Sequence, residues 1–104
     1  MDDNNLEQIE NDISVLIKQI IFDIRPQKII NPDTFRILYE RLDEYKNKIH
    51  DSKVLSRSMA GKLFYLYSSM VLEAKYDSYS DRFMNELSKL RISLLHIYDE
   101  DMLA

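Results

Sequence analysis

Residues 6–24 read LEQIENDISVLIKQIIFDI, and this stretch decides the fold. Its apolar residues return at spacings of three and four, which places them on one face of an α-helix. We therefore predict a helix over residues 4–24. Pro26 ends it, because the residue before a proline is pushed out of the helical backbone region. The apolar face consists of Leu6, Ile9, Ile13, Leu16, Ile17, Ile20 and Ile24.

The same spacing recurs in three later stretches and predicts helices over residues 32–50, 52–74 and 79–98. Asn31 and Pro32 mark a start clearly, because asparagine caps well and proline fits the first helical position. Residues 99–104 form a short acidic tail. The candidate N-caps are Asp51 and Ser52 for the third helix, and Ser78 and Ser80 for the fourth.

The chain has 104 residues, enough for one domain, with only one glycine and two prolines to supply turns. Such a composition favours an all-α fold over a β-sandwich or barrel. Short connections between long amphipathic helices favour antiparallel neighbours. We therefore predict a single domain, residues 1–104, folded as an antiparallel up-down four-helix bundle.

The third predicted helix is apolar on more than one side, which predicts that it is the most buried element. Gly61 lies in its middle, where glycine costs about 1 kcal/mol relative to alanine. It faces the same side as Tyr65 and Leu72. Close packing of another helix of the bundle is the favoured interpretation. A groove for a partner is the second.

The sequence offers no recognisable catalytic, cofactor-binding or metal-binding residues. Cysteine is absent, and neither His50 nor His96 belongs to a Glu-x-x-His pair. A single glycine cannot build a phosphate-binding loop. The acids are interpreted as solvated helix faces. The net charge of −4, with acidic ends and a mildly basic middle, does not favour nucleic-acid binding. No stretch is long and apolar enough for stable membrane insertion, and the amino terminus has no signal-peptide pattern.

The outer face of the fourth helix is the best candidate for partner binding. It combines isolated apolar residues with nearby charges, which is the pattern of a small apolar patch with a charged rim. Tyr65, Tyr76 and Tyr79 are also expected to be exposed. The predicted partner-binding residues are Tyr79, Arg82, Lys89, Ile92, Leu95, His96 and Met102.

Two segments carry a resemblance to a known family. VLSRSM, residues 54–59, opens the third helix, and FMNELSKL, residues 83–90, begins the fourth after a short Tyr/Ser-containing loop. Over roughly residues 6–98 the layout resembles the immunity proteins for pediocin-like (class IIa) bacteriocins, the enterocin A immunity family. The resemblance implies an antiparallel four-helix bundle in the cytoplasm of a Gram-positive bacterium, where a peripheral position at the inner membrane face is also compatible with the family.

The resemblance also implies a function. Members protect a cell from a pore-forming peptide by binding the mannose-phosphotransferase permease with its bound bacteriocin from the cytoplasmic side. The carboxy-terminal half sets recognition, which corresponds here to residues 77–104. The leading hypothesis is therefore a non-enzymatic bacteriocin immunity protein. The alternative is a cytosolic helical adaptor or regulator, homodimeric through the Gly61 face. A small enzyme or ligand-binding bundle is the third.

Overall fold

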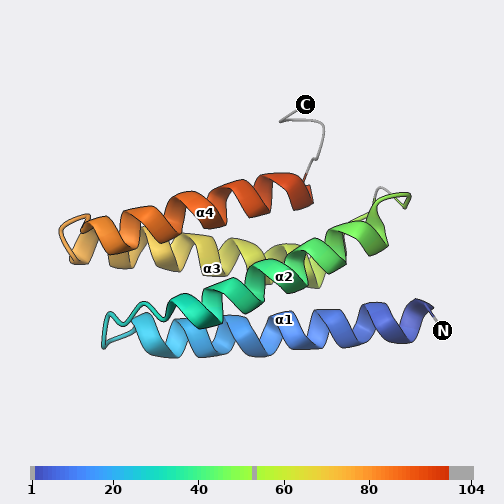
Figure 1. The fold of residues 1–104 in the computed structure, drawn as a ribbon, viewed down its shortest axis with the longest axis horizontal. Helices are drawn as coiled ribbons and strands as arrows, with labels where there is room; N and C mark the ends of the chain where they lie inside the picture. Colours follow the sequence, from blue (N-terminus) through green and yellow to red (C-terminus); the bar gives the residue numbers. More distant parts are fainter. Residues whose placement is uncertain (1, 53, 99–104) are drawn as a thin grey trace.

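The computed structural model describes residues 2–52 and 54–98 and contains only helices there, which confirms the predicted all-α class. The elements, shown in Figure 1, are α1 (Asp2–Ile24), α2 (Pro32–Ile49), α3 (Arg57–Tyr76) and α4 (Asp81–Tyr98). Within the described ranges, none of the helices has the length and apolar character that a membrane crossing requires.

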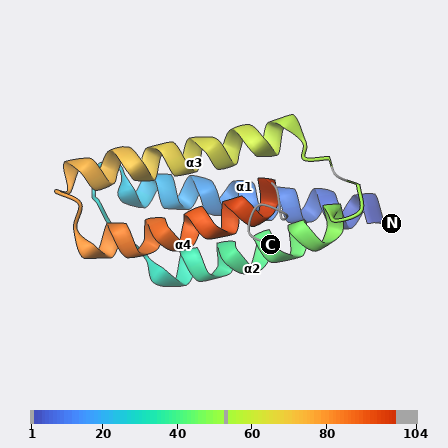
Figure 2. The same cartoon turned by 90° about the horizontal axis from the view of Figure 1, so that it is seen from above.

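The chain reverses direction at each connection, so successive helices run in opposite directions (Figures 1 and 2). α1 packs against α2 and α3, and α4 packs against α3 and α2. Across the described part of the chain, the backbones of α2 and α3 do not approach each other closely, and neither do those of α1 and α4. The order around the bundle is therefore α1, α2, α4, α3. As a result α1 and α3 are parallel neighbours, and the connection after α2 crosses one end of the bundle (Figure 2).

The predicted apolar faces build the core. Five isoleucines of α1 are buried, and α2 contributes Phe35, Leu38, Leu42 and Tyr45. Burial of this apolar surface is the main stabilising contribution to such a bundle. The remaining buried apolar residues are Met59, Leu63, Leu66, Met70 and Ala74 on α3, and Phe83, Leu90, Leu94 and Ile97 on α4.

The third helix begins at Arg57, so the predicted start at residue 52 is too early. Ser56 is the N-cap, because its hydroxyl oxygen accepts a hydrogen bond from the backbone N–H of Met59 at 3.1 Å. Ser52 is engaged elsewhere. Its hydroxyl donates to the carbonyl of Ile49 at 2.9 Å and accepts from the N–H of Val54 at 3.2 Å. Ser52 thus closes the turn after α2 instead of starting α3.

The fourth helix begins at Asp81, two residues later than predicted from Ser78. Ser78 and Tyr79 have positive φ angles of 54° and 55°, which a helix start does not allow. Ser80 directly precedes the helix, and its carbonyl accepts from the N–H of Met84 at 2.9 Å. The competing candidate, Ser80, therefore occupies the start of α4.

The expectation that the acids lie on solvated helix faces is wrong for two of them. Glu73 and Glu86 are 7% and 6% exposed, so the acids are not all solvated. Among the described residues, α3 carries more buried positions than any other helix, as predicted. Its second apolar side nevertheless lies on the surface, since Phe64, Tyr65 and Leu72 are 68%, 50% and 42% exposed. α3 therefore supplies both a core face and an outer apolar face.

Candidate binding groove between α1 and α3

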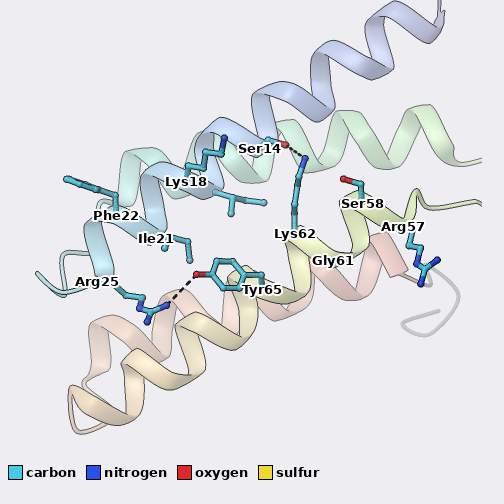
Figure 3. A pocket seen from close by; sticks show the side chains of 11 residues that line it. Ser14, Lys18, Ile21, Phe22, Arg25, Arg57, Ser58, Gly61, Lys62 and Tyr65 are labelled. Carbon is cyan, nitrogen blue, oxygen red and sulfur yellow. Dashed lines mark hydrogen bonds between the residues drawn. The ribbon is translucent and has the colours of Figure 1, made fainter.

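A groove of about 800 Å³ runs between the parallel neighbours α1 and α3 (Figure 3). Its apolar lining includes Ile17 and Ile21 of α1 together with Tyr65 of α3. Ile17 belongs to the core face of α1, whereas Ile21 lies on the adjoining side and is only partly buried. The groove therefore forms where the apolar surface of α1 extends past the core toward solvent.

Two hydrogen bonds bridge the groove from one helix to the other (Figure 3). The Lys62 ammonium donates to the Ser14 hydroxyl at 2.9 Å, and the Arg25 guanidinium donates to the Tyr65 hydroxyl at 3.4 Å. All four side chains lie at the surface of the seam, where a single hydrogen bond contributes little net stability. These bridges can therefore be exchanged for contacts with a bound partner at small cost.

Gly61 opens into this groove. A Cβ atom built on Gly61 would meet no heavy atom within 4 Å, so no helix of the bundle packs closely there. The favoured interpretation of Gly61, close packing within the bundle, is therefore wrong. Gly61 instead lines the groove together with the small residues Ser14 and Ser58. Small side chains allow another backbone to come close.

The charged residues that line the groove are all basic. They are Lys18 on α1, Arg25 directly after the end of α1, and Arg57 and Lys62 on α3. Arg25 also pairs with the buried carboxylate of Glu73 at 3.6 Å, which ties α1 to α3. The rim thus surrounds an apolar floor with positive charge in an otherwise acidic chain.

A second hollow continues the groove along α3. Arg25 and Tyr65 belong to both, and the continuation adds Leu72, Lys75 and Tyr79. Its charged residues are again basic. The two hollows together follow most of the length of α3.

Comparison with family models, with curated proteins and with solved structures finds no match to this chain. The relation to bacteriocin immunity proteins therefore stays a proposal, and the function has to be argued from the residues and their geometry.

Elsewhere a buried carboxylate, Glu86, and a half-buried one, Glu10, link helices to each other. Glu86 on α4 accepts a short hydrogen bond from the Tyr39 hydroxyl on α2. Burial, and then the hydrogen bond and charge of Glu86, raise the pKa of Tyr39 above its ordinary value. Glu10 on α1 accepts from Tyr45 at 2.9 Å and from Ser56 at 3.2 Å. In the described ranges, the acids and histidines form no cluster of three or more that could hold a metal ion.

Of the seven predicted partner-binding residues, all but Met102 lie within the described part of the chain. Lys89, Ile92 and His96 share one face of α4, because residues three, four and seven apart align on a helix. Leu95 lies in a separate hollow between α3 and α4, lined also by Phe64 and Tyr67. Met102 lies outside the described residues.

Tyr79 and Arg82 flank the turn before α4. Tyr79 is exposed, as predicted together with Tyr65 and Tyr76, and it lines the continuation of the groove. Arg82 binds Asp77 at 3.4 Å. The hydroxyl of Ser80, followed by the charge of Arg82, holds the pKa of Asp77 below its ordinary value. Arg82 therefore has a structural partner in this turn.

Sequence reasoning missed the basic rim, since its residues come from two helices whose contact no local pattern reveals. The available signal was the side of α3 that carries Gly61, Tyr65 and Leu72. That side was identified, but its surroundings were predicted as another helix of the bundle rather than a groove.

Proposed function

We propose that this chain is a binding protein without catalytic activity, and that it holds a helix of another protein in the groove between α1 and α3. The observation that carries the proposal is the open apolar groove with its basic rim. Peptide helices bind in this way by laying an apolar face into a hydrophobic groove. An enzyme site would instead need polar groups converging on one point.

The biological role that we propose is immunity to a pore-forming bacteriocin of class IIa type. The resemblance of residues 54–59 and 83–90 supports this role, as does the all-α fold with its helices alternating in direction. In this proposal the protein acts in the cytoplasm of a Gram-positive bacterium, where it binds the receptor permease complex at the inner membrane face.

Expression in a bacteriocin-sensitive strain tests the role. We expect survival to rise during exposure to at least one member of a panel of class IIa bacteriocins. A Gly61→Leu variant, which fills the groove, should lose that protection, whereas Ile92→Ser on α4 should keep it. Unchanged killing across the panel contradicts the immunity role. If Ile92→Ser loses protection and Gly61→Leu keeps it, the binding surface is the outer face of α4 and not the groove.

A cytosolic adaptor that forms a homodimer through the Gly61 face is the second candidate. Tyr65 and Leu72, which are 50% and 42% exposed on the same side of α3 as Gly61, favour it because exposed apolar patches often mark protein–protein contacts. Light scattering of the purified protein measures its mass in solution. A dimer that Gly61→Leu dissociates supports this candidate, and a monomer rules out the dimeric form.

A further inference from the structure

We infer that the occupant of the groove between α1 and α3 is an acidic amphipathic helix of a partner protein. This helix presents apolar side chains to Ile17, Ile21 and Tyr65, and it presents Asp or Glu side chains to the basic rim. The inference rests on the proposed function, because it specifies the chemistry of what that groove binds.

The shape of the surface suits a helix. The groove and its continuation extend along α3 from Ser58 to Lys75. At a rise of about 1.5 Å per residue, this length accommodates about five helical turns. A small ligand is normally enclosed over most of its surface, and here it would be largely open to water. A helix needs only one of its faces covered.

The groove lining also suits a close approach of backbone. Gly61 has open space in front of it, and Ser14 and Ser58 line the same groove. Helices that pack against small residues come closer together and bury more surface along their length. Gly61 has no such role within the bundle, so its cost in helix stability is explained by a partner that needs the space.

Charge decides what kind of helix fits. Lys18, Arg57 and Lys62 form no ion pair with the described carboxylates, whereas Arg25 is paired with Glu73. The hydrogen-bond partners that bridge the groove, Ser14 and Tyr65, are both neutral. Three cations around an apolar floor are therefore available to acidic side chains.

A second copy of this chain is a poorer occupant. Packing this face against itself would bring Arg57, Lys62 and Lys75 of one copy near the same cations of the other. Like charges across an interface oppose association and act against wrong partners. The basic rim thus favours a distinct acidic helix over self-association.

The test uses the purified chain and a fluorescent synthetic peptide of about 18 residues, which matches the groove length. One peptide carries leucine on one helical face and glutamate on the others. A matched peptide carries lysine in place of every glutamate. Fluorescence anisotropy should show binding of the glutamate peptide at least about tenfold tighter than the lysine peptide, and salt should weaken it.

Two variant pairs with equal change in charge locate the site. Lys18→Glu with Lys62→Glu should weaken binding of the glutamate peptide by about tenfold or more. Lys46→Glu with Lys48→Glu, both on α2 and away from the groove, should leave it unchanged. Gly61→Leu should block binding while circular dichroism and thermal unfolding show an intact fold. Equal binding of both peptides, or equal loss in both variant pairs, overturns the inference.

Two further outcomes also overturn it. Phosphatidylglycerol vesicles that bind the protein when the glutamate peptide does not would assign the groove to a membrane surface. A dimer in solution that dissociates with Gly61→Leu would assign it to a second copy. If the protein protects cells but does not bind the glutamate peptide, the acidic helix is rejected as the occupant and the immunity role stands. Peptide binding without protection removes the immunity role and leaves the occupant.

Discussion

Gly61 lies within α3, on the side that faces the groove. Its backbone is helical, and a Cβ atom there would contact nothing within 4 Å. We predict that Gly61→Ala raises the free energy of unfolding by about 1 kcal/mol, since alanine restricts the unfolded chain and adds no clash. Urea unfolding followed by circular dichroism measures the change. A lower midpoint would show that the glycine is needed inside the bundle.

Tyr39 predicts a response to alkaline pH. Burial, together with the hydrogen bond and charge of Glu86, raises its pKa above the ordinary value of 10.0. Above pH 10 the unfolded chain therefore releases this proton more readily than the folded chain, so stability falls as pH rises. The contribution is fully present below pH 10 and is lost as pH rises toward the folded-state pKa.

The ultraviolet absorbance of tyrosinate during an alkaline titration measures this effect. The native protein should show tyrosines that ionise late, including Tyr39, and Tyr39→Phe should remove one of them. Tyr45 and Tyr98 also have raised pKa values, chiefly through burial, so a late fraction should persist in the variant. The prediction is contradicted if Tyr39→Phe has as many late-ionising tyrosines as the native protein.

Single residues were predictable where their own position in the periodic pattern sufficed. Exposure of Tyr65, Tyr76 and Tyr79 followed from the pattern and is confirmed. Burial of Glu73 and Glu86 did not follow from it. Each lies three residues after a core position, yet a carboxylate is buried only with a partner. Those partners, Arg25 and Tyr39, come from other helices.

At the scale of the elements, the N-cap of α3 can be tested directly. The Ser56 hydroxyl accepts from the N–H of Met59 and donates to the Glu10 carboxylate. We predict that Ser56→Ala lowers the free energy of unfolding by about 1 kcal/mol or somewhat more. Ser52→Ala should change it by less than about 0.5 kcal/mol, as is usual for an exposed position. If urea unfolding showed a larger loss of stability for Ser52→Ala than for Ser56→Ala, α3 would begin at residue 52 instead.

The helices themselves were predictable, and their ends less so. The spacing of the apolar residues predicted both ends of α2 to within one residue. Asn31 and Pro32 helped, because an N-cap residue followed by proline is a strong local signal for a helix start. The start of α3 was ambiguous, since Ser52 and Ser56 are both capable caps. The structure distinguishes them, because Ser52 forms hydrogen bonds within the turn after α2, whereas Ser56 donates a hydrogen bond to Glu10, which is 46 residues away.

At the scale of the whole molecule, the order of the helices around the bundle was beyond the sequence pattern. An apolar stripe says which face of a helix turns inward, and several orders bury the same stripes equally well. The observed order makes α1 and α3 parallel neighbours, and the groove exists because of that pairing. The basic rim and the apolar floor could therefore be recognised as one groove only from the order of the helices around the bundle.

The hydrogen bond between Tyr39 and Glu86 reports this order, because it joins α2 to α4 across 47 residues. We predict that Tyr39→Phe and Glu86→Gln are coupled by about 0.5–3 kcal/mol in a double-mutant cycle of urea unfolding at neutral pH. As a matched control, Tyr39→Phe and Glu73→Gln should be additive, since α2 and α3 lie diagonally. If α2 packed beside α3 instead, Tyr39 would lie away from α4, and the first cycle would be additive within about 0.5 kcal/mol. That result would remove the groove along with the order that creates it.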